Sequence, residues 1–407
     1  MKKTTIGMLF LLLLVILCVP MKNTNVKAAG YVYTYSNMVE HDDVIYYIKS
    51  DEATSKSAGK CTIYGLDVKA NKKSKIAVSN NTISNLFVYK DILYYTTYTD
   101  DYLDITYSVS LDTNEKTKIC QGDLHYVDEN GIVYSFYSDS KYSLYKANLD
   151  GRAEQLIYEG TEVFDYVKAI GSKLYFYQTD ITAYKIKLMY MKSSDSKLTV
   201  LTTDKFEKDN YSTYYLSISD IVEMNGNIFY QYGNYEGTGN FWYGVLKKID
   251  KNNKKKTVYD SMTEPEIYHD TKYIYLNYVD NSNSCIKYNT KTGKKTKYTC
   301  EINNGESLSV IDSKSYSAST NNQNYITVSR FSSGTDKKNL KKNFIKFSYK
   351  QNSNLTYYAD VEKLGSYFLV YVERIDYNDT SYGWRGKYVG IQWYVADAKG
   401  KVVANFS

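Results

Sequence analysis

One short phrase recurs along this chain and limits its fold more than any other feature. A turn of Asp, Asn or Gly leads into an apolar residue and then an aromatic one, as in D-I-L-Y-Y at Asp91, G-S-K-L-Y-F-Y at Gly171 and N-G-N-I-F-Y at Asn225. A period of about 40–50 residues with several strands per unit is typical of a β-propeller blade. The apolar position returns about every 46 residues, at Ile45, Leu93, Val133, Leu174, Ile228, Ile274, Ile326 and Phe368.

Each repeat has room for four strands. In the second repeat, alternating runs precede and follow the phrase, and T-K-I-C at Thr117 closes the unit. Pairs such as Asp150-Gly151 and Thr292-Gly293 favour hairpin turns. The sequence therefore predicts an all-β protein, a propeller of four-stranded antiparallel blades over residues 30–407. Eight blades is the direct count, but six or seven remain open because the repeats are less regular from about residue 305. The alternative is a pair of β-sandwiches, which need no fixed internal period.

Residues 1–29 are interpreted as a secretory signal peptide. Lys2 and Lys3 precede an apolar run from Ile6 to Pro20, and Ala28 or Ala29 offers a cleavage position. An uncleaved anchor is the alternative, although the run is short for a membrane span. Removing the four lysines of the leader leaves 47 basic against 45 acidic side chains, so the net charge falls from +6 to +2. We expect a secreted or envelope-associated protein with no transmembrane span after cleavage, and no nucleic-acid partner.

Two phrases carry a resemblance to a known group of proteins. I-L-Y-Y-T-T at Ile92 and L-Y-K-A-N-L-D-G at Leu144 resemble the secreted Gram-positive β-propeller proteins of unknown function with low-density-lipoprotein-receptor-like (YWTD) or TolB-like repeats. The resemblance extends from Val44 to about Lys297. Tyr95 stands at the Trp place of the YWTD motif and Thr97 at its Asp place. The resemblance implies a propeller and does not carry a function over.

The connections within each repeat differ in length and chemistry. Those expected between the first and second strands are tight, whereas those expected between the second and third are long and varied, and binding usually lies on such loops. The long connections collect acidic and aromatic side chains, which hold sugars or form protein hot spots. The candidate ligand-binding residues are Tyr235, Phe241, Trp242, Tyr243, Tyr382, Trp384, Asp376 and Asp379. Lysines gather at the tight turns, and either solubilise them or dock on an anionic surface.

Motifs for catalysis, cofactors and metals are missing from the sequence. No nucleophile elbow, zinc helix, phosphate loop or dinucleotide fingerprint occurs, so we expect no enzyme activity, no cofactor and no metal. His41 and His269 occupy matching turns, where a turn role is the simpler interpretation. A glycosidase or lyase using loop carboxylates remains the rival, with Asp100, Asp101, Asp139 and Asp379 as its candidates. A scaffold without a small ligand is a further alternative.

The cysteine spacing suggests one disulfide, and the loops suggest the kind of partner. Cys285 and Cys300 flank a hairpin turn almost symmetrically, so they are the candidate disulfide in an exported chain. A bridge between Cys61 and Cys120 would be a guess. We predict a monomeric recognition module that binds a cell-wall or surface glycan, or an extracellular protein, at its long loops.

Overall fold

The computed structural model describes residues 38–50, 60–99, 103–205, 216–235, 242–262, 267–276, 285–298, 306–311, 314–332, 336–378 and 387–406. Its strands form eight consecutive antiparallel sheets, seven of four strands and one of three. The fold class is therefore the predicted all-β, eight-bladed β-propeller, and six or seven blades are excluded. Within these residues, no helix is long and apolar enough to cross a membrane.

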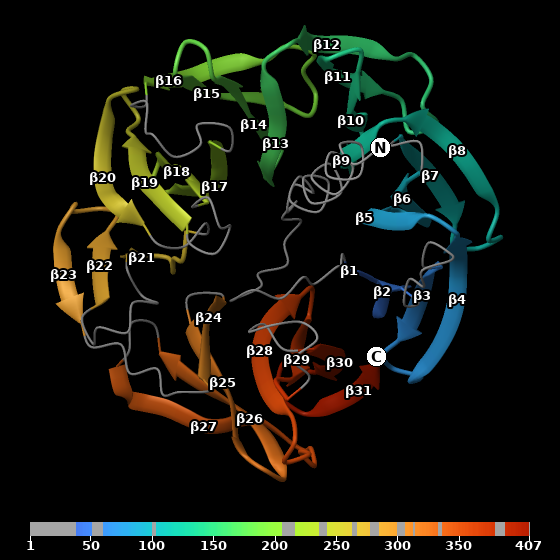
Figure 1. Ribbon diagram of the computed structural model, residues 1–407, viewed down its shortest axis with the longest axis vertical. Coiled ribbons are helices and arrows are strands. Elements are labelled where there is room, and N and C mark those ends of the chain that lie inside the picture. The colour runs from blue at the N-terminus through green and yellow to red at the C-terminus, as the bar shows by residue number, and fades with distance from the viewer. Residues whose placement is uncertain are drawn as a thin grey trace, which may run out of the picture. The chain divides into compact units, whose positions relative to one another are not determined.

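Two compact units divide the described chain, and each is considered separately. Figure 1 labels their strands. The smaller unit contains the fourth and fifth sheets, made of β13 (Val163–Ile170), β14 (Lys173–Asp180), β15 (Lys185–Lys192), β16 (Thr199–Lys205), β17 (Ser217–Met224), β18 (Asn227–Tyr235), β19 (Trp242–Ile249) and β20 (Lys255–Met262). The larger unit begins with the first three sheets, made of β1 (Met38–His41), β2 (Val44–Ser50), β3 (Cys61–Asp67), β4 (Lys72–Ser79), β5 (Thr82–Tyr89), β6 (Ile92–Tyr98), β7 (Asp104–Ser110), β8 (Lys116–Gln121), β9 (Asp123–Asp128), β10 (Gly131–Ser138), β11 (Lys141–Ala147) and β12 (Gln155–Gly160).

The last three sheets also belong to the larger unit. They are made of β21 (Tyr273–Leu276), β22 (Cys285–Asn289), β23 (Lys295–Tyr298), β24 (Glu306–Ile311), β25 (Lys314–Asn322), β26 (Tyr325–Ser332), β27 (Asp336–Ser348), β28 (Thr356–Leu364), β29 (Tyr367–Asp376), β30 (Lys387–Ala396) and β31 (Val402–Phe406). The sixth sheet has three strands, and an isolated bridge between His269 and Ile274 stands where its first strand would be.

The repeated phrase is explained by burial on both faces of the second strand. Successive side chains of a strand point to opposite faces. In β2, Ile45 and Tyr47 pack into a core shared with the eighth sheet, whereas Tyr46 and Ile48 pack into a core shared with the second. A second strand packed in this way therefore needs an uninterrupted apolar and aromatic run rather than an alternating one.

Each sheet is formed by one continuous stretch of chain. The first sheet follows the order β1-β2-β3-β4 and the last the order β28-β29-β30-β31, so neither borrows a strand from the other end of the chain. Contact between the eighth and first sheets is made by side chains. Leu369 and Trp393 belong to the same core cluster as Ile45, and the Tyr367 hydroxyl donates a 2.6 Å hydrogen bond to Asp43 Oδ1.

The seventh blade departs from the predicted ladder. Ile326 was expected in a second strand, but it lies in β26, the third strand of its sheet. The second strand is β25, whose sequence K-S-Y-S-A-S-T-N-N alternates serine with other residues and lacks the apolar–aromatic phrase. Residues 331–342 mostly belong to β26 and β27, so they do not form one of the long second-to-third connections.

Connection lengths agree with the prediction in only part of the chain. The first-to-second turns are tight, as in His41–Val44 and Tyr89–Ile92. The second-to-third connections are long in five blades, including the connection between β29 and β30. They are short in the third, fourth and seventh blades, where β10 and β11, β14 and β15, and β25 and β26 form tight hairpins.

Tyr95, at the Trp place of the YWTD motif, gives a test of the packing. Its side chain is fully buried beside Tyr107, and its hydroxyl has no hydrogen-bond partner among the described residues. A buried donor without a partner lowers stability. Tyr95→Phe is expected to raise the free energy of unfolding by about 1 kcal/mol in urea denaturation. Tyr175→Phe, which removes a hydroxyl bonded to Glu223, is expected to lower it. Equal losses in both variants would contradict this view of the core.

Candidate functional site: an arginine pocket in the eighth blade

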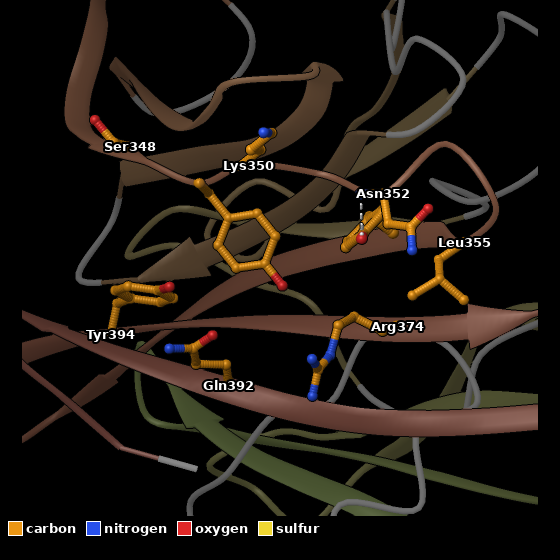
Figure 2. A pocket seen from close by; sticks show the side chains of 9 residues that line it. Ser348, Lys350, Asn352, Leu355, Arg374, Gln392 and Tyr394 are labelled. Carbon is orange, nitrogen blue, oxygen red and sulfur yellow. Dashed lines mark hydrogen bonds between the residues drawn. The ribbon is translucent and has the colours of Figure 1, made fainter.

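A pocket of about 460 Å³ opens beside the eighth sheet in the larger unit. Its residues come from the end of β27, the link between β27 and β28, and strands β28, β29 and β30. They are Ser348, Tyr349, Lys350, Asn352, Leu355, Tyr357, Arg374, Gln392 and Tyr394, and Figure 2 shows how they surround the cavity. The inter-blade link lies at the same end of the blade as the long connection between β29 and β30, so the pocket borders a region predicted to bind ligand.

Arg374 forms the charged floor of the pocket. In β29 it lies in register with Tyr357 on one side and Gly390 on the other. A Cβ atom at position 390 would lie 2.9 Å from Arg374 Nη2, so the glycine leaves room for the guanidinium. Arg374 Nε is buried and has no hydrogen-bond partner among the described residues. No described carboxylate pairs with this arginine, and a buried, unpaired guanidinium nitrogen is unfavourable unless a ligand satisfies it.

Three tyrosines form the walls. Tyr349 meets Tyr357 and Tyr394 edge-on, with ring centroids 5.7 Å and 6.1 Å apart. Tyr394 stacks on Phe347 at 4.0 Å, which fixes its ring. Burial raises the pKa of Tyr349 and raises that of Tyr394 to about 12, while the nearby Arg374 charge opposes both shifts. The two phenols therefore stay protonated at neutral pH and remain hydrogen-bond donors.

The link that closes the pocket is held in place by hydrogen bonds. The Tyr349 amide donates to the Asn324 carbonyl at 2.9 Å, and the Gln351 side-chain amide donates to the Thr320 carbonyl at 2.8 Å. The Asn352 amide donates to the Tyr357 hydroxyl at 2.7 Å, the dashed line in Figure 2. A wall that is ordered before a ligand arrives reduces the entropy lost on binding.

The lining has a clear electrostatic character. Its nine residues include Arg374 and Lys350 but neither Asp nor Glu. Gln392 and Asn352 add amides that both donate and accept hydrogen bonds. The pocket can therefore hold an anionic group of a ligand at the Arg374 guanidinium. The ligand's hydroxyl groups can then bond the surrounding amides. A pair of carboxylates for glycoside hydrolysis is not part of this lining.

The neighbouring Glu373 lies on the opposite face of β29 from Arg374 because strand side chains alternate. It is 5% exposed, and burial raises its pKa to about 7. The exposed Tyr358 and Tyr388 lie near this carboxyl, whose charge raises the pKa of both phenols further. No hydrogen bond to the Glu373 carboxyl is found among the described residues.

Glu373 predicts an unusual dependence of stability on pH. Because its pKa is higher in the folded protein than in the unfolded chain, the folded state binds a proton more tightly between these values. Stability is therefore expected to fall as pH rises from about 4.5 to about 7. Glu373→Gln should remove this loss and be more stable than the wild type at pH 8, by on the order of 1–3 kcal/mol. Urea denaturation at pH 4.5 and 8 measures the free energy of unfolding of both proteins. If Glu373→Gln loses as much stability between these pH values as the wild type, the raised pKa of Glu373 is contradicted.

The candidate residues named from the sequence fall in both units. In the smaller unit, Tyr235 is in register with Trp242 and Asn234 with Tyr243 across β18 and β19, and the side chains of Tyr235, Trp242 and Tyr243 are outside the described set. In the larger unit, Asp376 ends β29, and its Oδ1 accepts the Asn378 amide at 2.9 Å. It is a turn residue and does not line the pocket. The remaining candidates lie outside the described residues: Phe241, Asp379, Tyr382 and Trp384.

Only some of the carboxylate and cysteine candidates lie among the described residues. Asp100 and Asp101 lie outside the described residues, while Asp139 is exposed in the tight turn after β10. Cys285 is in β22 opposite Tyr298, but its side chain and Cys300 are outside the described set, so that disulfide stays a prediction. Cys61 and Cys120 do not pair with each other. Both are buried thiols, and burial raises the pKa of Cys120 to about 12.

The pocket residues were not predicted from the sequence, although one signal for them was present. The chain uses lysine almost everywhere and has only four arginines. Arg374 follows the apolar run Y-F-L-V-Y-V and Glu373 in a predicted second strand. An arginine kept in such a strand, in a chain that otherwise chooses lysine, favours a site for bidentate recognition.

The fold and the pocket together define the class: a β-propeller whose eighth blade presents an arginine in an aromatic pocket. No family model matches the chain, and no curated protein matches it. Solved structures similar to it include one from a study of two prolyl endopeptidases (TM-score 0.48, 10% identity, 84% of this chain and 55% of that one). Another is dipeptidyl peptidase 4 of Porphyromonas gingivalis (0.48, 11%, 81% and 56%).

A third is the β-propeller domain of the Trilobed protease from Pyrococcus furiosus (TM-score 0.41, 12% identity, 79% of this chain and 97% of that one). The chain spans little more than half the length of the two peptidase chains.

Proposed function

We propose that this protein is an exported recognition module that binds an acidic sugar residue of an extracellular or cell-envelope glycan in the Arg374 pocket. The observation that carries the proposal is the Arg374 guanidinium, whose buried Nε has no partner among the described residues, in a lining that contains no carboxylate. A carboxylate on the ligand would supply the counter-charge that the described residues do not.

The rest of the lining suits a sugar better than a simple ion. The volume of about 460 Å³ falls within the range of about 300–1,000 Å³ usual for small-ligand sites. The rings of Tyr349, Tyr357 and Tyr394 provide apolar faces with polar tips, on which the C–H face of a sugar ring can stack. The amides of Gln392 and Asn352 are placed to bond hydroxyl groups.

Matched polymers test the proposal. The chain without its predicted leader would be measured against uronic-acid polysaccharides and the same polysaccharides after reduction of their carboxyl groups. We expect saturable binding to the acidic polymers, loss of that binding after reduction, and loss in Arg374→Met. Equal binding to both forms would overturn the carboxylate contact. Binding only to extracellular proteins, or no binding to any acidic polymer, would overturn the glycan proposal itself.

A further inference from the structure

A second cluster of chemically active side chains lies at the opposite, short-turn end of the first two blades. His41 ends β1, Asp42 follows it in the turn, and Asp91 lies in the corresponding turn of the second blade. His41 Nε2 is 3.7 Å from Asp42 Oδ2 and 3.9 Å from Asp91 Oδ1. One ligand atom from each residue lies within 4.8 Å of the others. The cluster is independent of the Arg374 pocket and of the function proposed for it.

A buried tyrosine beneath this cluster supplies the second observation. Tyr46 is 6% exposed, and no hydrogen bond of its hydroxyl is found among the described residues. Burial raises its pKa, and the nearby charges of Asp42 and Asp91 raise it further. A phenol near two acids is suited to donate a hydrogen bond to a carboxylate held in place by a cation.

We propose that His41, Asp42 and Asp91 bind a divalent transition-metal ion of the zinc type, with Tyr46 orienting the carboxylates. One imidazole nitrogen and two carboxylate oxygens are a suitable ligand set for zinc, leaving a fourth position for water. Tetrahedral zinc with bonds of about 2.0–2.2 Å places its ligand atoms roughly 3.3–3.6 Å apart. The two His41 separations of 3.7 and 3.9 Å need a small contraction, and the two carboxylates, whose ligand atoms lie within 4.8 Å of each other, must also draw together. Asp42 and Asp91 are 87% and 70% exposed, so their side chains have room to rotate.

The matching turn of the sixth blade shows what a histidine and an aspartate do there without such a cluster. His269 precedes Asp270, but the Asp270 carboxylate accepts the Lys272 and Tyr273 amides, each at 2.7 Å. Its other oxygen accepts the Tyr275 hydroxyl at 2.6 Å. That carboxylate is already satisfied. Among the described residues, only the His41 turn brings three such ligands together. The sequence alone predicted a turn role for both histidines, and His269 fits it.

A metal at this position would connect the first two blades. His41 and Asp42 belong to one sheet and Asp91 to the next, so a bound ion adds a link between turns about 50 residues apart in sequence. An ion that binds only the folded state stabilises that state in proportion to its concentration relative to its dissociation constant. The alternative is a protonated His41 paired with the two acids, which needs no ion.

Calorimetric titration with zinc chloride, on the full exported chain without an affinity tag, tests the proposal. We expect one saturable site in the wild type and its loss in His41→Ala and in Asp91→Asn, with His269→Ala unchanged. Tyr46→Phe should weaken binding by about 10- to 100-fold, as is usual when an outer-shell partner of a ligand is removed. Zinc should raise the melting temperature of the wild type and of His269→Ala, but not that of Asp91→Asn.

Three results would overturn the proposal. They are no saturable zinc binding by the wild type, binding that persists in both His41→Ala and Asp91→Asn, and binding that is lost in His269→Ala. The exposed Asp91 side chain can be changed with little risk to folding, so Asp91→Asn decides the matter even if His41→Ala does not fold. Circular dichroism of each variant confirms that a loss of binding is not a loss of structure.

Discussion

Arg374→Met is expected to weaken binding of the acidic polymers by at least about 30-fold, equivalent to roughly 2 kcal/mol. Removing one partner of a buried charged hydrogen bond typically costs this much or more. Methionine keeps an unbranched chain of similar reach and so preserves packing against Gly390 and Tyr357. The neutral side chain offers no donor to the ligand carboxylate, which would then be desolvated without compensation.

The same variant should be as stable as the wild type without ligand, or more stable by about 1 kcal/mol. The reason is that it removes a buried nitrogen for which the described part of the chain offers no hydrogen-bond partner. Arg330→Met is the matched control: its guanidinium lies 4.5 Å from the Phe344 ring and does not line the pocket. Affinity would be measured by calorimetry and stability by urea denaturation. If Arg374→Met loses stability together with binding, Arg374 is a structural residue and the pocket is not a ligand site.

The blades could be predicted from sequence because one strand in each is buried on both faces. Leu93 and Tyr95 face one neighbouring blade and Tyr94 the other, so the pattern is continuous and repeats with the blade. The prediction failed at Ile326 because β25 has small serines where the phrase was expected. The apolar residues of the third strand then resembled the missing second one.

The sites were harder to predict because each depends on contacts between segments far apart in sequence. The pocket needs the 349–355 link, Arg374 and Gln392 together, and the absence of an acid beside Arg374 is visible only in three dimensions. Asp91 approaches His41 only because adjacent blades place their first turns side by side. Loop composition favoured Asp376 as a ligand-binding residue, but its carboxylate accepts the Asn378 amide within a turn.

The largest expected loss of stability in the smaller unit comes from Asp204, which joins the fourth sheet to the fifth. This carboxylate in β16 is 3% exposed. Its Oδ1 accepts the Lys247 and Lys255 ammonium groups, each at 2.6 Å, and its Oδ2 accepts the Tyr230 hydroxyl at 2.6 Å. Burial alone would raise its pKa, but these three hydrogen bonds outweigh burial and lower it.

Asp204→Ala should lower the free energy of unfolding by about 3–5 kcal/mol, because it leaves a partly buried Lys247 without its counter-charge. Lys255→Met should cost less, since Lys247 and Tyr230 still satisfy the carboxylate. The exposed Asp260→Ala should stay within about 0.5 kcal/mol of the wild type. Urea denaturation at pH 7 ranks the three variants, and equal losses for Asp204→Ala and Asp260→Ala would contradict a buried charge cluster.

The same carboxylate sets how this unit responds to acid. Because the pKa of Asp204 is lower in the folded protein than in the unfolded chain, its stabilising effect is complete above the unfolded value of about 4 and is lost as pH falls through the folded value. Asp204→Ala should therefore differ most from the wild type at neutral pH and converge with it in acid. The direction is opposite to that expected for Glu373, whose raised pKa favours the protonated folded state. Measuring both variants from pH 3 to 8 separates a paired buried carboxylate from an unpaired one within a single fold.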